Sequence, residues 1–309
     1  MDVSTQQPAD SLSVVIPTYN REEVLKKVIG GYLTQSGHAI RELLIVDDGS
    51  TDDTEAMVRD IGQPGPFPIR YLKQSNKGPA AARNFGIREA RSNVILFTDS
   101  DVVPKADLVS QHLAWHQQNP ELSVAVLGYV TWPPDPRPTP FMKWYGEEKL
   151  FSYRKLQHKH EIGFPDFFTC NVSLKTDFLR SCGQFDEDFK TTAYEDIELA
   201  YRLGKAGLRL LYNSRAIGYH HQFFKFADAC RKARAAATAR RVFLRKEAGK
   251  QLLEPLLKRR SRLWFRVAKW FGMGVAVVLT PARRLLDSYL PLPRLVYKLY
   301  FWHDATRLC

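Results

Sequence analysis

Two aspartates separated by one residue follow a short apolar run. Residues 94–97 read Val-Ile-Leu-Phe, and Asp99-Ser100-Asp101 comes almost directly after them. The run predicts a buried strand, and two carboxylates spaced in this way on the following turn can converge on one cation. Mg²⁺ and Mn²⁺ prefer oxygen ligands and commonly combine one or two carboxylates with phosphate oxygens. The same residues are also typical of a solvated turn, so the motif alone leaves both interpretations open.

A second acidic pair ends another apolar run. Residues 43–46 read Leu-Leu-Ile-Val, and Asp47 and Asp48 follow. A carboxylate at this position can accept a hydrogen bond from the N–H of a nucleotide base or from a sugar hydroxyl. Ser50 or Thr51 could equally cap a helix that begins here. Taken alone, this motif is weak evidence for a binding site.

A third acidic pair, Glu195-Asp196, opens a predicted helix over 195–206. The helix dipole stabilises a negative charge at this end and keeps an acid ionised. Such a residue becomes a general base near neutral pH only if burial shifts its pKa upward. Helix capping is the plainer interpretation of the pair when it is considered alone.

Predicted strands that alternate with predicted helices place these motifs. The strands cover 13–16, 43–46, 69–72, 94–97, 123–131 and 208–212, and the helices cover 52–61, 79–89 and 195–206, with a further helix after Asn20 as its N-cap. The alternation predicts an α/β fold with a doubly wound, mostly parallel sheet. Ligands bind such sheets at the carboxyl ends of the strands, which is where two of the acidic pairs lie.

The net charge of +12 is unevenly distributed along the chain. Residues 222–309 contain 20 Lys and Arg against 5 Asp and Glu, a net charge of +15, so residues 1–221 carry −3. We therefore expect two regions, a slightly acidic α/β body over 1–221 and a basic, amphipathic helical region over 222–309. Basic regions of this kind usually meet phospholipid or nucleic acid. No nucleic-acid-binding motif accompanies the charge, so we expect no nucleic-acid partner.

The termini and cysteines predict a cytoplasmic chain. Residues 1–10 are polar and lack the basic start and apolar run of a secretory signal. The four cysteines, at 170, 182, 230 and 309, show no CxxC spacing. Sparse cysteines of this kind suit a reducing compartment better than a disulfide scaffold or a zinc site.

Six motifs in a fixed order give the sequence a resemblance to a known enzyme family. They read VVIPTYN at 14–20, VDDGSTD at 46–52, GPAAARN at 78–84, DSD at 99–101, GQFDE at 183–187, and ED at 195–196 before YRL at 201–203. Together they resemble the family 2 glycosyltransferases, whose nucleotide-sugar-binding fold is called GT-A. The resemblance covers about residues 11–221 and implies that residues 1–221 form a nucleotide-sugar-binding catalytic domain.

The resemblance implies an inverting enzyme with a divalent cation, Mg²⁺ or Mn²⁺, as cofactor. Its donor would be a nucleotide diphosphate sugar, and its acceptor a hydroxyl of a glycan or a lipid-linked molecule. Cell-envelope polysaccharide, glycolipid or lipid-linked glycan synthesis would be the setting.

The family's functional residues carry over to matching positions of this chain. The resemblance implies nucleotide-sugar binding by Pro17, Thr18, Tyr19, Asp48, Arg83, Asp99 and Ser100. It implies metal ligation by Asp101 and Asp99, with Asp101 the more direct ligand. It also implies a contact of His221, or of its neighbour His220, with the metal or with the pyrophosphate. It implies that Asp196 is the general base, with Glu195 beside it.

The C-terminal region carries an apolar stripe at near-helical period. Apolar residues fall at 253, 256, 257, 263, 264, 267, 270 and 271, with Lys and Arg between them. This pattern predicts a helix that lies in the interface of an anionic membrane, which would place the protein at the inner face of the plasma membrane. The apolar segment 271–279 is too short to span a bilayer as a straight helix. Packing on the catalytic body or an oligomer interface are the alternatives.

Two other functions are compatible with a fold of this class. A sugar nucleotidyltransferase would need a glycine-rich, basic phosphate loop after the first strand, where Pro17-Thr18-Tyr19-Asn20 stands instead. A non-catalytic membrane adaptor could retain the fold, although the presence of Asp101 and Asp196 argues against it. A Rossmann dehydrogenase is excluded because no GxGxxG follows any predicted strand.

Overall fold

The computed structural model describes residues 11–35, 39–61, 65–150 and 153–255, together with residues 286, 288 and 297. The chain forms two compact units. The first contains the described residues within Met1–Thr131, Leu156–Lys190 and Glu195–His221. The second contains those within Trp132–Lys155, Thr191–Tyr194 and Gln222–Cys309.

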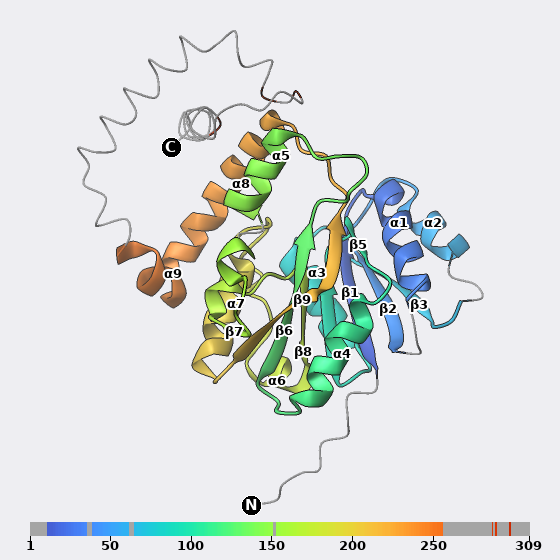
Figure 1. The fold of residues 1–309 in the computed structure, drawn as a ribbon, viewed down its shortest axis with the longest axis horizontal. Coiled ribbons are helices and arrows are strands. Elements are labelled where there is room, and N and C mark those ends of the chain that lie inside the picture. The colour runs from blue at the N-terminus through green and yellow to red at the C-terminus, as the bar shows by residue number, and fades with distance from the viewer. Residues whose placement is uncertain are drawn as a thin grey trace, which may run out of the picture. The chain divides into compact units, whose positions relative to one another are not determined.

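A nine-stranded sheet forms the centre of the first unit (Figure 1). In chain order its strands are β1 (Leu12–Thr18), β2 (Ile40–Asp47), β3 (Ile69–Lys73), β4 (Val94–Thr98), β5 (Val102–Pro104), β6 (Val124–Thr131), β7 (Glu161–Ile162), β8 (Asn171–Lys175) and β9 (Arg209–His220). Their order in the sheet is β3-β2-β1-β4-β8-β6-β9-β5, with β7 also paired to β9. Strands β3, β2, β1 and β4 are parallel, whereas β8 runs antiparallel to β4 and β6.

Helices cover both faces of this sheet. They are α1 (Glu22–Leu33), α2 (Thr54–Ile61), α3 (Pro79–Glu89), α4 (Leu108–Gln118), α6 (Thr176–Ser181) and α7 (Glu195–Lys205). Successive side chains of a strand point to opposite faces. Accordingly Val14 and Ile16 of β1 pack with Leu25 of α1 in the core that α2 and α4 also join. The intervening Val15 faces α3, and an added Cβ on Gly86 would lie 2.4 Å from its Cγ1.

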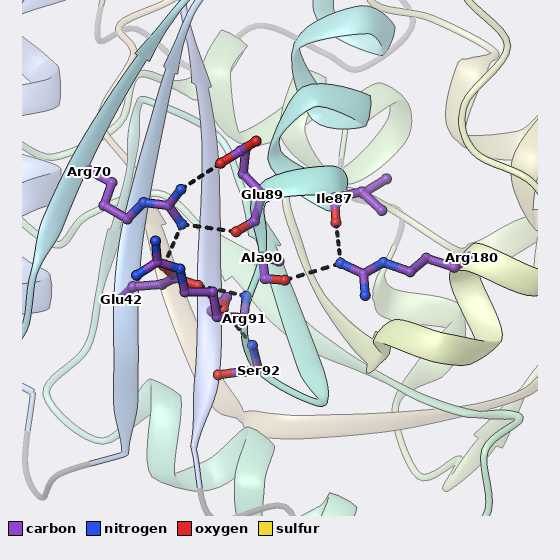
Figure 2. Close-up of polar contacts among 9 residues, drawn as sticks. Glu42, Arg70, Ile87, Glu89, Ala90, Arg91, Ser92 and Arg180 are labelled. Atoms are coloured by element: carbon purple, nitrogen blue, oxygen red, sulfur yellow. Dashed lines mark hydrogen bonds and ion pairs between the residues drawn. The ribbon is translucent and has the colours of Figure 1, made fainter.

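A cluster of charged residues anchors the C-terminal end of α3 (Figure 2). Arg70 of β3 donates to Glu42 of β2 at 2.7 Å and to the Glu89 carboxylate at 2.6 Å. Arg180 of α6 donates to the carbonyl oxygens of Ile87 and Ala90 at 2.8 and 3.0 Å. These contacts satisfy carbonyl groups that a helix end leaves without intrahelical partners. They fix the C-terminal end of α3 beside the first residues of β2 and β3. The N-terminal half of α3 therefore lies toward the carboxyl ends of these strands.

The second unit is built around aromatic packing. Its elements are α5 (Pro140–Tyr145), a π-helical turn (Gly146–Leu150), α8 (Phe226–Arg245) and α9 (Glu247–Leu252). Phe141 of α5 and Phe226 of α8 approach with ring centroids 5.5 Å apart, and Phe243 of α8 stacks on Tyr194 at 5.0 Å. Burial of large rings supplies most of the driving force for such packing.

Short 3₁₀ turns occupy Tyr153–Leu156 and Phe164–Asp166. The predicted interfacial stripe beyond residue 255 and the apolar segment 271–279 lie outside the described residues. Within the described parts of the chain, no helix is both long and apolar enough to cross a membrane.

The predicted α/β fold class is confirmed, and the helix over Pro79–Glu89 has its predicted bounds. Two local predictions were wrong. Asn20 does not cap α1, because that helix begins at Glu22 with Arg21 in the cap position. The strand predicted over 208–212 continues to His220, because β9 pairs with β5, β6 and β7 along its length.

Candidate active site

The carboxyl ends of β1, β2 and β4 meet at one edge of the sheet. Thr18 pairs with Asp47 across β1 and β2, and Val15 pairs with Phe97 across β1 and β4. The three segments that follow these strands therefore begin side by side. Among them, Thr18 is buried, while Tyr19 is 47% exposed.

The segments after β1 and β2 are tied together by Asn20. Its backbone N–H donates to Ser50 Oγ at 2.9 Å, and its Oδ1 accepts from the Thr51 N–H at 2.8 Å. Asn20 has a φ of 50° and Gly49 a φ of 85°, a region that Asn and Gly adopt more readily than other residues. Asn20 thus joins the loops after β1 and β2 instead of capping a helix.

Asp48 organises the loop that leads into α3. Its Oδ1 accepts from Gln74 Nε2 and from the Lys77 N–H, each at 2.8 Å, and its Oδ2 accepts from the Gly78 N–H at 2.8 Å. The side chain is buried, so these donors compensate its desolvation. A carboxylate has further lone-pair sites beyond these three.

Arg83 on the first turns of α3 holds two acidic motifs together. Its Nη2 donates to Asp99 Oδ1 at 3.1 Å and its Nη1 to Glu195 Oε1 at 3.2 Å. Only 3% of the Arg83 side chain is exposed, and its guanidinium carbon lies 5.6 Å from the centroid of the Phe185 ring. Burial opposes the charge of Arg83, but the carboxylates of Asp99, Glu195 and Asp196 outweigh it and raise the Arg83 pKa.

Asn84 fixes the turn that carries Phe185. Its Nδ2 donates to the Phe185 carbonyl and to Glu187 Oε1, each at 2.9 Å, and its Oδ1 accepts from the Phe185 N–H at 2.8 Å. Arg202 of α7 holds the same turn through the carbonyls of Cys182 and Gln184. Asn84 was not among the predicted site residues, although it ends the motif GPAAARN at 78–84. An Asn inside a predicted helix, where it is disfavoured, was a further signal.

Asp196 lies on the first turn of α7 and is half-buried. Its Oδ1 accepts from the Ile197 N–H at 2.8 Å. Burial, followed by the neighbouring Glu195 carboxylate, raises the pKa of Asp196 to about 7, against the opposing effect of Arg83. A carboxylate in this range can exchange a proton near neutral pH.

Asp101 contacts the two histidines in different ways. Its Oδ1 lies 3.6 Å from His220 Nε2, whereas its backbone carbonyl accepts from the His221 N–H at 2.7 Å. Burial, together with Lys27 and His220, lowers the pKa of His221 against the effect of Asp101. The ring of His220 is therefore the nearer one to the Asp101 carboxylate, while Asp99 is held by Arg83.

The residues at this edge fit a divalent cation that takes few protein ligands. Across the described ranges, no cluster of three or more His, Cys, Asp or Glu side chains could hold a metal ion. The basic side chains beside the Asp101 carboxylate are Arg21, whose Nη1 lies 3.8 Å from Oδ2, and His220, whose Nε2 lies 3.6 Å from Oδ1. Both distances exceed hydrogen-bonding range. Mg²⁺ bound with a nucleotide ordinarily takes one or two protein carboxylates as ligands, and phosphate oxygens and water complete its coordination.

Comparison with known families identifies the chain. The model of glycosyl transferase family 2 matches residues 13–182, more than half of the 309-residue sequence. The chain belongs to this family. The matched segment contains Asp48, Arg83, Asp99 and Asp101, and it ends before Asp196 and the two histidines.

Curated family 2 relatives include enzymes and longer synthases. The chain is 34% identical over 233 residues to validoxylamine A glucosyltransferase of Streptomyces hygroscopicus subsp. limoneus, a match covering 67% of this chain and 51% of that protein. It is 25% identical over 243 residues to hyaluronan synthase of Pasteurella multocida, covering 68% of this chain and 24% of that protein. The chain thus spans about half the length of the glucosyltransferase.

Solved glycosyltransferase structures share the fold of this family 2 chain. The mannosyltransferase PcManGT of Pyrobaculum calidifontis, in complex with GDP-Man and Mn²⁺, matches with a TM-score of 0.60 at 19% identity, over 97% of this chain and 85% of that one. S. aureus TarS in complex with UDP matches with a TM-score of 0.55 at 18% identity, over 96% and 90% of the two chains.

Proposed function

We propose that this chain is a metal-dependent, inverting glycosyltransferase that moves a sugar from a nucleotide diphosphate sugar to an acceptor hydroxyl. The observation that carries the proposal is the double contact of Arg83 with Asp99 and Glu195. It joins the acidic turn after β4 to the helix that bears Asp196. Family membership and the nucleotide sugars bound to structures of the same fold support it.

The donor would lie across the carboxyl ends of β1, β2 and β4. One wall of the nucleoside site would be formed by Pro17, Thr18 and the exposed Tyr19. Asp48 would accept a hydrogen bond from the nucleotide base, through a carboxylate lone pair that its three loop hydrogen bonds do not use. Arg83 and Ser100 would lie near the sugar and diphosphate. An arginine there would also offset part of the negative charge that the diphosphate brings to an acidic site.

Asp101 would be the main protein ligand of the cation, with Asp99 and one of His220 and His221 as further candidates. When bound, Mg²⁺ or Mn²⁺ would neutralise the charge that develops on the departing diphosphate. The Asp99 carboxylate would then be shared between the metal ion and the Arg83 guanidinium group, which already lies beside it.

Asp196 would act as the general base. Inversion requires one base that removes the proton of the acceptor hydroxyl as its oxygen attacks the anomeric carbon. A carboxyl group with a pKa raised to about 7 accepts that proton more readily than an ordinary aspartate. Glu195 would hold Arg83 and raise the Asp196 pKa by its charge.

The acceptor would be a glycan or a lipid-linked molecule at an anionic membrane, with the protein peripheral at the cytoplasmic face. The basic region 222–309 supports this part of the proposal by charge alone. We propose His221 as the end of the catalytic domain, the residue at which the last segment of the first unit ends.

The direct test is the reaction itself. The full chain, Mn²⁺ and a panel of α-linked nucleotide diphosphate sugars are followed by NMR during slow donor hydrolysis. Early appearance of the β-sugar, before it equilibrates in water, is the expected result. An α-sugar product would exclude inversion. Pyrophosphate release from a nucleoside triphosphate and a sugar 1-phosphate would replace the proposal with a nucleotidyltransferase, and no turnover of any donor would favour a non-catalytic adaptor.

A further inference from the structure

One face of α8 carries a row of exposed arginines. Exposed residues recur along the helix at intervals of three or four, which is the spacing of neighbours on one helical face. They are Ala227, Arg231, Arg234, Thr238, Arg241 and Arg245. We call the four arginines of this set the α8 arginine row. From Arg231 to Arg245 it extends about 21 Å along the helix axis, at about 1.5 Å per residue.

The opposite face of α8 is already occupied within the second unit. Its buried residues are Phe226, Ala229, Cys230, Ala239 and Phe243. Phe226 packs on Phe141 and Phe243 stacks on Tyr194. Consequently α8 has no apolar face left to insert into a bilayer, and the face that remains for a partner is the charged one.

Little negative charge neutralises this face. Asp228 is the sole acidic residue of α8, and it pairs with Arg231. Arg241 and Arg245 have no carboxylate partner among the described residues. The residues between the cations are mostly alanine, so short side chains separate the guanidinium groups.

We propose that the α8 arginine row is an electrostatic docking surface for anionic phospholipid. The inference rests on the membrane contact in the proposed function, and it names the residues that would make it. Arginine binds lipid phosphate through paired N–H donors, and each basic residue near an anionic surface strengthens binding about fivefold. A straight row of cations suits a planar array of phosphates. The row contains no aromatic residue on which a nucleic-acid base could stack, which favours lipid.

The experiment compares four full-length proteins in a vesicle sedimentation assay without donor or acceptor. They are the wild type, a variant with Arg231, Arg234, Arg241 and Arg245 changed to Gln, a second with the same four changed to Lys, and a control. The control replaces the exposed Lys26, Arg41, Lys159 and Arg215 of the first unit with Gln. It loses the same charge from another part of the chain. Vesicles contain phosphatidylcholine with or without about 30% phosphatidylserine.

We expect the Gln variant to bind anionic vesicles at least a hundredfold more weakly than the wild type at about 0.1 M salt. The Lys variant and the control should each stay within about tenfold of the wild type. The difference between wild type and Gln variant should shrink at about 1 M salt, where the screening length falls to about 3 Å.

Equal weakening in the Gln variant and the control would overturn the inference, because it would assign binding to total charge. Unchanged binding in the Gln variant would overturn it as well. Tighter binding of the wild type to duplex DNA than to anionic vesicles at the same salt would replace lipid with nucleic acid. Circular dichroism and nucleotide binding of each variant separate these outcomes from misfolding and from failure of the transferase proposal.

Discussion

Arg83 Nη1 lies 3.2 Å from Glu195 Oε1, although the two residues are 112 positions apart in the sequence. The contact joins the first turns of α3 to the first turn of α7. With the second contact of Arg83, to Asp99, it brings three separate sequence motifs to one place.

Changing Asp196 to Asn should remove the general base while leaving the donor site intact. We expect turnover to fall by roughly two to four powers of ten, the usual contribution of a positioned base, with donor affinity within a few-fold of the wild type. Steady-state kinetics and calorimetry of donor binding measure the two effects. Asp177→Asn, an exposed carboxylate on α6, is the control for loss of one charge. Near-normal turnover in Asp196→Asn would remove this residue from the mechanism.

The pH profile of turnover should report the raised pKa of Asp196. The base acts when it is ionised, so the rate should rise with pH and level off above about 7. Burial is the larger cause of the raised pKa and the Glu195 charge the second. Glu195→Gln removes only the second cause, so the rising limb should move to lower pH. A limb that stays in place, or moves upward, would contradict this electrostatic account.

Gly86 should be required for the position of Arg83. A Cβ at this site would lie 2.4 Å from Val15 Cγ1, so Gly86→Ala must push α3 away from β1. We expect a loss of about 1–3 kcal/mol in unfolding free energy and a drop in turnover, because Arg83 lies one turn away on the same helix. Gly30→Ala in α1 is the matched control, since no atom lies within 4 Å of its added Cβ. It should stabilise the protein by up to about 1 kcal/mol. Equal behaviour of the two variants would contradict the prediction.

The local pattern of the sequence predicts much of the fold, but it predicts few of the contacts among the site residues. The strands near residues 13–16, 43–46 and 94–97 and the helix Pro79–Glu89 have strong local signals. Strand β5 has only three residues, and its partner in β9 lies more than a hundred positions later. Glu195 is similarly distant from Arg83, at 112 positions, so no local window of sequence contains that pair. The resemblance to a family named these residues, but the contacts among them came from tertiary packing.

A buried histidine pair should make stability depend on pH. In the core, Asn171 Nδ2 donates to the Ala216 carbonyl, so Asn171 Oδ1 accepts from His112 Nε2 at 2.9 Å. That fixes His112 Nδ1 as the acceptor from Ser173 Oγ, which in turn accepts from His116 Nε2, each at 2.8 Å. Burial lowers the pKa of His112 to about 4, and burial with the Lys175 charge lowers that of His116.

Both histidines are therefore neutral in the folded protein and protonate more readily in the unfolded chain. The unfolded chain binds more protons between about pH 6.5 and 4, so stability should fall as the pH falls through this window. His112 alone contributes at most about 3 kcal/mol. Urea unfolding at several pH values measures the slope, which should be smaller in His112→Gln than in the wild type. An identical slope in both proteins would contradict the assignment.

The central claim is that the edge formed by β1, β2 and β4 binds a nucleotide diphosphate sugar together with a divalent cation held by Asp101. A thermal-shift screen of UDP-, GDP- and dTDP-sugars, with and without Mn²⁺, tests it most directly on the wild type and on Asp101→Ala. We predict that at least one nucleotide sugar raises the Tm of the wild type when Mn²⁺ is present, and that this rise is lost in folded Asp101→Ala. A rise of the same size without Mn²⁺, or in Asp101→Ala with it, would contradict the account, as would the absence of a shift with every nucleotide sugar.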